Sequence, residues 1–358
     1  KTLFLLRRRS LTHTHYAFYH TQPGLLFSGI VLYQGRTLVA CSPLLNMSFA
    51  TGIGGDATRT LTPKRTVVTA FSSTPPSAAA RGVDDVYEEG SWVLCVASSA
   101  ASLQQKGVVS CALSDGVIRT YDETTLQEIH SIPGQFHQRG TVSDLCHTTT
   151  SGGDHGASPL VVSSCTDGVV RIFDLRSSAT SSAAIQFQLP KNGEQALSVS
   201  FGYDGTLAAV GGGKGHIHFF DVRGSSLLGS YVDAHTEEVT KVRFQPTTTG
   251  TSSTTTSLLV SASEDGLACI HDTSQPTEEL ALRSVMNIQS PLRDVGFFGP
   301  SLEGLYCLTG SETMSVWHHD SAQRICNYFG TDLRTHLSTA MASSPSSTST
   351  TTTTTTTT

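Results

Sequence analysis

Residues 160–174 read LVVSSCTDGVVRIFD: an apolar run, the turn Thr166-Asp167-Gly168, and an alternating run that ends in Phe173-Asp174. Asp-Gly between two strand-like runs supplies the positive φ of a type I′ turn or of a related bulge, so the stretch predicts a β-hairpin. Residues 108–122 repeat it as VVSCALSDGVIRTYD, with Asp115-Gly116 in the turn and Tyr121-Asp122 at the end. Two such hairpins indicate an internal repeat.

Three more copies of the pattern follow along the chain. Residues 207–221 have a glycine-rich turn and end in Phe220-Asp221, residues 258–272 have the turn Asp265-Gly266 and end in Asp272, and residues 305–318 close at Trp317. The strand-end positions 121, 173, 220, 271 and 317 are separated by 52, 47, 51 and 46 residues. Each hairpin has a strand candidate before it and often one after it, so each unit predicts four strands.

An all-β propeller is the fold that this repeat predicts. Four-stranded units cannot bury both faces alone, and they pack radially into rings of typically about 4 to 8 units of roughly 40 to 45 residues. The longer spacing here has a visible cause, because the low-complexity insertion at residues 247–256 lies between two predicted strands of the fourth unit. A sixth, weaker unit is read at residues 24–50.

The hairpin with a strand ending in an aromatic residue and Asp resembles the WD40 repeat. In that family a His, a Ser or Thr, the turn Asp and a Trp form a hydrogen-bonded tetrad. The resemblance implies these roles for His235, Ser261 and Asp265, whereas His271 stands where the family has Trp, and the other units have lost the His or the Trp. Residues 85–335 are also similar to the WD repeat-containing protein 89 family, which implies a non-catalytic propeller that is seven-bladed when intact.

The candidate site residues are structural positions of the repeat, and the sequence indicates no catalytic, cofactor-binding or metal-binding residue. They are Asp115, Gly116, Tyr121, Asp122, Asp167, Gly168, Phe173, Asp174, Phe220, Asp221, His235, Ser261, Asp265, Gly266, Asp272 and Trp317. The Asp residues of the turns recur because such turns favour Asp. Arg119 and Arg171 occupy equivalent places in two units; they could line a partner-binding face, but exposure to solvent is the preferred interpretation.

Two clusters resemble chemical motifs and are interpreted structurally. Residues 211–215 read GGGKG, but they lack the GxxxxGK[ST] spacing and precede a strand, so a propeller turn is favoured over a phosphate loop. His216 and His218 share one face of a strand, as metal ligands would, but no third ligand has a supporting motif, so packing is favoured. There is neither a GxSxG motif nor a cysteine in a protease-like context.

Charge and composition exclude several classes of protein. Only 15% of the residues are charged, which argues against a helical bundle, and no window approaches 18 consecutive apolar residues, which excludes a membrane-spanning helix. The net charge is −6, and residues 1–55 hold five cations and no acid, which leaves 18 Lys+Arg against 29 Asp+Glu, or −11, from Asp56 onward. This acidic body argues against direct binding of nucleic acid. Eight cysteines without a CxxC pair indicate reduced thiols in a cytoplasmic or nuclear protein.

The expected domain boundaries follow from this pattern. Residues 1–82 are expected to be a poorly structured extension with at most one degenerate unit, residues 83–335 the propeller, and residues 336–358 a disordered Ser/Thr tail. The first 46 residues, which precede Met47, are either a transit peptide or sequence upstream of the true start; if they are genuine, organellar import follows. Because no closing units follow Trp317, the chain is expected to be a fragment of a longer protein or a truncated gene model.

The function predicted from these features is that of a non-catalytic scaffold that binds other proteins through its propeller face and loops, with no cofactor. Two alternatives stay open. A propeller enzyme would need acid or His side chains that converge on the central channel with strongly shifted pKa values. A chromatin- or RNA-associated subunit would need a continuous basic patch on one face.

Overall fold

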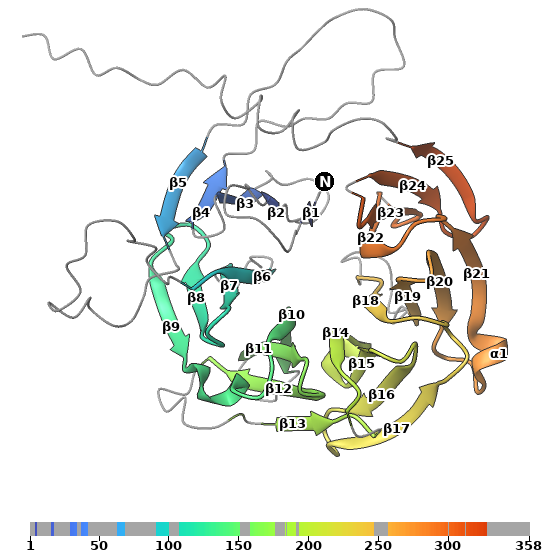
Figure 1. Cartoon of the computed structure of the whole chain (residues 1–358), viewed down its shortest axis with the longest axis horizontal. Helices are drawn as coiled ribbons and strands as arrows, with labels where there is room; N and C mark the ends of the chain where they lie inside the picture. The colour runs from blue at the N-terminus through green and yellow to red at the C-terminus, as the bar shows by residue number, and fades with distance from the viewer. Residues whose placement is uncertain are drawn as a thin grey trace, which may run out of the picture.

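Five antiparallel sheets of four strands each stand side by side around a common centre (Figure 1). This computed structural model describes residues 91–99, 107–150, 158–175, 183, 185–190, 193–246, 257–299, 301–311 and 313–327, together with the backbone of five short strands between residues 4 and 68. Each four-stranded sheet is called a blade here, and the blades are numbered one to five in chain order. The predicted all-β propeller is therefore confirmed.

Within every blade the strands pair in chain order, from the innermost strand at the ring centre to the outermost one. Blade one consists of β6 (Val93–Ser99), β7 (Val108–Leu113), β8 (Ile118–Asp122) and β9 (Glu128–Ile132). Blade two consists of β10 (Val142–Thr150), β11 (Ser158–Cys165), β12 (Val169–Asp174) and β13 (Ile185–Gln188). Blade three consists of β14 (Ala196–Gly202), β15 (Leu207–Gly212), β16 (Ile217–Asp221) and β17 (Ser226–Tyr231).

The last two blades keep the same order. Blade four consists of β18 (Val239–Phe244), β19 (Leu258–Ser263), β20 (Leu267–Asp272) and β21 (Leu282–Asn287). Blade five consists of β22 (Leu292–Phe298), β23 (Gly304–Thr309), β24 (Met314–His318) and β25 (Gln323–Asn327). Three short helical turns lie in connections: η1 (Gly134–His137), η2 (Tyr203–Gly205) and α1 (Glu278–Ala281).

A further sheet precedes blade one in the chain. It contains β1 (Phe4–Leu5), β2 (Tyr16–Ala17), β3 (Gly29–Tyr33), β4 (Thr37–Cys41) and β5 (Pro63–Val68), and in Figure 1 it lies between blades one and five. The weak unit read at residues 24–50 contains β3 and β4. The threonine-rich insertion at 247–256 and the tail at 336–358 lie outside the described residues, so the expected domain boundaries stay predictions.

The hairpin turns take the bulged form rather than type I′. The amide of Gly116 donates to the carbonyl of Leu113 at 3.0 Å, and the amide of Leu113 donates to the carbonyl of Val117 at 2.8 Å. Gly116 has φ +83°, whereas Asp115 has no positive φ. A three-residue loop with one left-handed glycine matches this pattern. Asp115 accepts the amide of Val117 at 3.0 Å, and Asp265 accepts that of Leu267 at 2.9 Å.

The apolar core lies between neighbouring blades. Val162, Ile172 and Phe187 of blade two pack in one buried cluster with Val199 and Val210 of blade three, and similar clusters join the other neighbours from blade one to blade five. Each sheet therefore buries both faces, which explains the short continuous apolar runs in the sequence. Within the described residues, no helix combines the length and the apolarity needed to cross a membrane.

Candidate functional site

Each innermost strand has one irregularity near its start, at an equivalent position in every blade. In all five blades the register between the innermost strand and the next shifts by one residue at that point, which is a β-bulge. The residues just after the five bulges are Cys95, Asp144, Ser198, Lys241 and Asp294. The repeat thus brings two acids, one base, one hydroxyl and one thiol into a single ring of positions.

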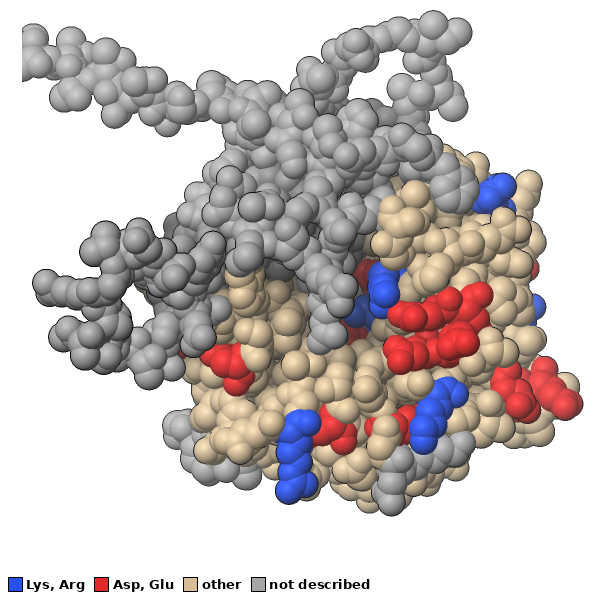
Figure 2. Space-filling view, viewed as in Figure 1, with Lys and Arg blue, Asp and Glu red and all other residues tan. Residues whose placement is uncertain are grey.

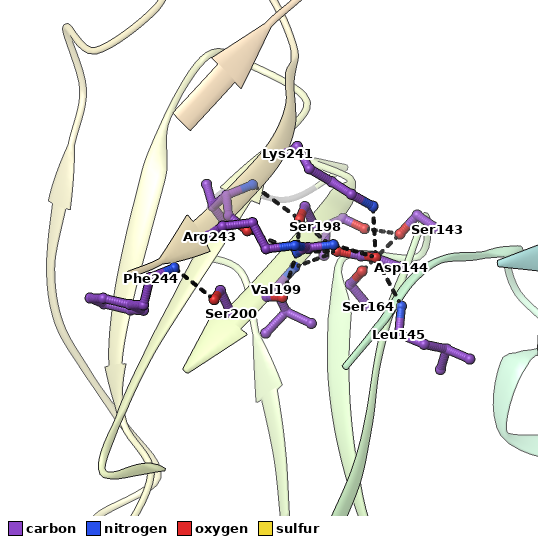
Figure 3. Close-up of polar contacts among 12 residues, drawn as sticks. Ser143, Asp144, Leu145, Ser164, Ser198, Val199, Ser200, Lys241, Arg243 and Phe244 are labelled. Atoms are coloured by element: carbon purple, nitrogen blue, oxygen red, sulfur yellow. Dashed lines mark hydrogen bonds and ion pairs between the residues drawn. The ribbon is translucent and has the colours of Figure 1, made fainter. Parts of the chain in front are cut away.

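Asp144 is the hub of a polar network that joins three blades (Figure 3). Its Oδ1 atom accepts from Lys241 Nζ at 2.8 Å, and its Oδ2 atom accepts from Ser198 Oγ at 2.7 Å and from Arg243 Nη1 at 3.0 Å. The amide of Leu145 also donates to Oδ1, at 3.1 Å. The Asp144 side chain is only 3% exposed, so this carboxylate is buried and its oxygens are saturated with donors.

The two cations decide the protonation state of Asp144. Burial alone would raise the pKa of its carboxyl, but the charges of Arg243 and Lys241 and their hydrogen bonds outweigh burial and hold that pKa well below its usual range. Asp144 in turn raises the pKa of the Arg243 guanidinium against the effect of burial. The network therefore holds the ionised carboxylate of Asp144 between Lys241 and Arg243.

Asp294 behaves in the opposite way, although its position in blade five is equivalent. Burial raises the pKa of its carboxyl, the charges of Lys241 and Arg243 lower it, Asp144 raises it again, and the net shift is upward. Burial and the neighbouring Asp294 raise the pKa of Tyr306. One central acid is thus firmly ionised and the other is pushed toward its neutral form.

The thiols around the centre are not activated. Burial raises the pKa of Cys95, and Asp144 raises it further. Burial likewise raises the pKa of Cys146 to about 12 and that of Cys307 above its usual range. A nucleophilic cysteine needs a depressed pKa, so these groups are suited to packing rather than to attack on a substrate.

Sequence reasoning missed this central network, although a signal for it exists. Asp144, Lys241 and Asp294 are charged residues at the third position of three innermost strands. An alignment of the first strands of the units on their first apolar residue, Val142, Val239 and Leu292, would have placed them at one level. The repeat is recognised by its hairpins, and the innermost strands lie outside them.

The predicted tetrad of blade four is connected as a chain of four side chains. His235 Nδ1 lies 3.0 Å from Asp265 Oδ2, His235 Nε2 lies 2.8 Å from Ser261 Oγ, and Ser261 Oγ lies 3.2 Å from His271 Nε2. His271 therefore takes the hydrogen-bonding place of the absent Trp. Burial lowers the pKa of His271 to about 4, so its imidazole is neutral at pH 7.

Blade two holds a partial tetrad that sequence reasoning missed. His137 Nε2 lies 2.9 Å from Ser163 Oγ, and its Nδ1 lies 3.0 Å from the carbonyl of Gly116. His137 precedes Ser163 by 26 residues, the same interval as between His235 and Ser261, and this spacing is the signal that could have found it. Asp167 pairs with Arg171 at 2.7 Å instead, so Arg171 does not simply face solvent as the preferred interpretation held.

The remaining repeat positions lie in cores and turns. The buried strand-end aromatic residues are Tyr121, Phe173, Phe220 and Trp317. Asp122, Asp221 and Asp272 accept backbone amides of the turn that follows each third strand, at 2.8–3.2 Å. Trp317 Nε1 donates to Ser315 Oγ at 2.8 Å, within its own strand. Asp174 ends β12, and Gly168 and Gly266 occupy hairpin turns with φ +82°.

An acidic rim, defined as Glu237, Glu238 and Glu264, is held together by hydrogen bonds between the connection after His235 and the hairpin turn of blade four. The amide of Glu264 donates to the carbonyl of Glu238 at 3.0 Å, and Ser263 Oγ donates to that of Glu237 at 3.2 Å. These bonds keep the connection after His235 against the hairpin turn that contains Asp265. Figure 2 shows acidic side chains gathered near the ring centre, on the side of blades four and five.

The rim acids repel one another. Burial raises the pKa of Glu238, and the charges of Glu264 and Glu237 raise it further, whereas Arg293 lowers it. Arg293 Nη1 lies 2.7 Å from Glu264 Oε1, with the arginine side chain 55% exposed. The rim therefore presents more negative than positive charge to solvent.

The structure also places beside His216 and His218 a carboxylate that the sequence did not indicate. Glu194, in the connection between blades two and three, places its carboxylate against both rings, and the donor atoms of these three residues lie within 4.8 Å of one another. The glycine cluster at 211–215 covers the end of β15 and most of the turn before β16, and the amide of Gly212 donates to the carbonyl of His216 at 2.8 Å.

Comparison with known proteins gives relatives of one kind. The chain is 29% identical over 212 residues to the WD repeat-containing protein GTS1 of Arabidopsis thaliana, which covers 59% of this chain and 50% of the relative. It is 26% identical over 231 residues to the WD repeat-containing protein 89 homolog of Dictyostelium discoideum, and the match covers 64% of this chain and 57% of the relative. An uncharacterized WD repeat-containing protein of Saccharomyces cerevisiae is 28% identical over 209 residues, and the match covers 57% of this chain and 48% of the relative.

No protein-family model matches the chain. The chain spans about half the length of the curated relatives it matches. The ring of four-stranded blades, the tetrad of blade four and these relatives lead to one conclusion: the chain is a β-propeller of the WD40 type, similar to the WD repeat-containing proteins.

Proposed function

We propose that this propeller is a non-catalytic scaffold whose acidic rim binds a basic segment of a partner protein. The observation that carries the proposal is that Glu237, Glu238 and Glu264 lie close together. Among the ion pairs of the described residues, Arg293 is the one cation that pairs with these acids. Complementary charge steers association and selects partners. The similarity to WD repeat-containing proteins supports a protein-binding role of this general kind.

The contacts of Asp144 at the centre of the ring support the non-catalytic part of the proposal. Acids with shifted pKa values do converge there, which is what the enzyme alternative requires. A general base, however, needs a free oxygen and a pKa near the working pH. Asp144 has neither, because six donor atoms occupy its oxygens and two cations hold its pKa low.

The partner class follows from the same charge. The net of −11 from Asp56 onward disfavours direct contact with a nucleic acid phosphate backbone, and a basic protein segment fits the rim better. We also propose a cytoplasmic or nuclear location, because the seven cysteines that the structure describes are free thiols and thiols persist in reducing compartments.

A binding titration with a short Lys/Arg-rich peptide tests the proposal. The triple variant Glu237→Gln, Glu238→Gln, Glu264→Gln is expected to weaken binding at least about tenfold and to flatten its salt dependence, as loss of charge steering requires. A control that removes the same charge from Glu128, Asp204 and Glu279, exposed acids on β9, η2 and α1, is expected to bind like wild type. Equal loss in both variants would reject the rim as the site.

A further inference from the structure

We propose that Glu194, His216 and His218 form a binding site for a divalent zinc ion in blade three. This inference is independent of the acidic rim and of the scaffold role. Its basis is that the fold brings two imidazoles and one carboxylate together in a buried position, with all donor atoms within 4.8 Å of one another. Two histidines and one glutamate are a donor set that zinc uses in proteins.

The distances suit a metal ion. Glu194 Oε1 lies 3.1 Å from His216 Nδ1, and Glu194 Oε2 lies 3.3 Å from His218 Nε2. Two ligands bound about 2.1 Å from a tetrahedral zinc ion lie about 3.4 Å apart, which is close to the separation of each ring from its nearer carboxylate oxygen. Three protein ligands leave the fourth position of the ion for water. His216 is the most exposed of the three residues, with 11% of its side chain exposed.

The fold prepares this geometry from the sequence upward. His216 precedes β16 directly and His218 lies within it, so strand alternation puts both side chains on one face. Gly212, paired across the hairpin, leaves room for the carboxylate, because a Cβ at this position would collide with Glu194 Oε1. A larger residue at position 212 would push Glu194 away from both rings.

A hydrogen bond through its second ring nitrogen orients the imidazole of His218. Its Nδ1 atom lies 2.7 Å from Ser230 Oγ on β17, which turns the Nε2 atom toward Glu194. A metal-binding histidine usually makes such a hydrogen bond through its second nitrogen, and the loss of that bond commonly costs about 10- to 100-fold in metal affinity. Ser230 therefore has the place of a positioning residue for the proposed ion.

Charge also favours a cation at this point. The Glu194 side chain is 0% exposed, and the described ion pairs give it no Lys or Arg, only the two histidines. A buried carboxylate needs a compensating positive charge. Its Oε2 atom makes no hydrogen bond with the described residues, since the contact to His218 meets only the distance of an ion pair. A divalent ion would neutralise the carboxylate and occupy this oxygen.

Blade four shows what the same place in the fold contains without a metal. The turn glycine Gly215 packs against the carbonyl of His235, and Gly168 packs in the same way against the carbonyl of Glu194, so the two residues hold equivalent positions. His235 is joined to its blade by hydrogen bonds to Ser261 and Asp265. In blade three Val210 and Lys214 stand at those two positions of the hairpin, and the metal would replace the missing tetrad.

The test is zinc titration of the full chain after removal of metals with a chelator. We expect one Zn²⁺ ion per chain, a rise in the melting temperature on its addition, and a Co²⁺ spectrum of a tetrahedral site without thiolate charge transfer, which separates this site from the cysteines. The variant His216→Gln is expected to lose at least about 100-fold in affinity, and Ser230→Ala about tenfold. His130→Gln, which changes a histidine of β9, is the matched control and is expected to bind like wild type.

Two results would overturn the proposal. One is a wild-type chain that binds no stoichiometric zinc, and the other is equal zinc binding by wild type and His216→Gln. Either would leave Glu194 and its histidines as a hydrogen-bonded cluster that closes blade three. If His216→Gln fails to fold, Ser230→Ala decides, because it leaves all three ligands in place and changes affinity only if His218 binds the ion.

Discussion

The centre of the ring and its acidic rim carry charge in opposite ways. At the centre Asp144 is buried and paired with Lys241 and Arg243, and its pKa lies below its usual range. At the rim Glu238 stands among like charges, and its pKa is raised. Paired charges hold blades together, whereas gathered like charges weaken the fold slightly and remain available to a partner. Charge alone therefore says little about a role until its neighbours are known.

The largest effect is expected when the central pairing is broken. Asp144→Ala leaves Lys241 and Arg243 without their common anion, and removal of one partner of a buried ion pair typically costs about 3–5 kcal/mol. Urea denaturation at pH 7 measures the free energy of unfolding. Glu128→Gln, which removes an exposed acid on β9, serves as the control and should change it by less than about 0.5 kcal/mol. A loss below about 1 kcal/mol for Asp144→Ala would mean that the centre does not hold the blades together.

The two central acids, Asp144 and Asp294, should contribute to stability in opposite ways as the pH changes. The folded pKa of Asp144 is depressed, so its contribution to stability is complete above the unfolded value of about 3.9 and is lost as the pH falls below it. The folded pKa of Asp294 is raised, so its ionisation lowers stability as the pH rises through that pKa. We expect Asp144→Asn to be destabilising at pH 7 and Asp294→Asn to be tolerated there. Urea denaturation at pH 7 and pH 3 checks this; equal losses for both variants at pH 7 would contradict it.

A smaller loss of unfolding free energy is expected at the bulge of blade four, between Val239 and Lys241. Thr240 Oγ1 donates to the carbonyl of Leu292 in blade five at 2.8 Å, next in sequence to Lys241. Thr240→Val keeps the shape and removes this bond between blades, which should cost about 0.5–1.5 kcal/mol. Ser143→Ala, which removes the equivalent bond to the carbonyl of Ala196, should cost a similar amount. If neither variant changes the unfolding free energy, the bulges do not tie the blades together.

The fold could be predicted because its signal is local. An Asp-Gly turn between an apolar run and an alternating run is contained within 15 residues, and repetition at intervals near 50 residues converts a hairpin into a propeller blade. The turn type was left open between two forms, and the bulged one is found. The relay from Asp265 through His235 to Ser261 follows the family pattern, and the structure connects these residues as that pattern implies.

The sites that depend on contacts between units were not predicted. Asp144 and Lys241 are 97 residues apart, and only the closure of blades around a centre brings them within 2.8 Å. Glu194 lies 22 residues before His216, in a connection without a motif, so nothing local marks it as a third ligand. The sequence therefore indicates the strand face shared by His216 and His218, but it does not indicate the residue that faces them.

The smallest change in unfolding free energy is expected at the rim. Its sign distinguishes the rim from the centre, because removing a rim charge should stabilise the fold and removing Asp144 should destabilise it. Glu238→Gln removes one of several neighbouring like charges, so the unfolding free energy should stay within about 0.5 kcal/mol of wild type and should rise rather than fall. Because the folded pKa of Glu238 is raised, wild type loses this contribution as the pH rises through that pKa, and the gain from the variant should be seen at pH 7 and not at pH 3. Salt screens exposed charges, so the gain should also shrink in high salt. A loss above about 1 kcal/mol would instead give Glu238 a structural role like that of Asp144, and a rim acid that stabilises the blade is a poor candidate for a partner-binding residue.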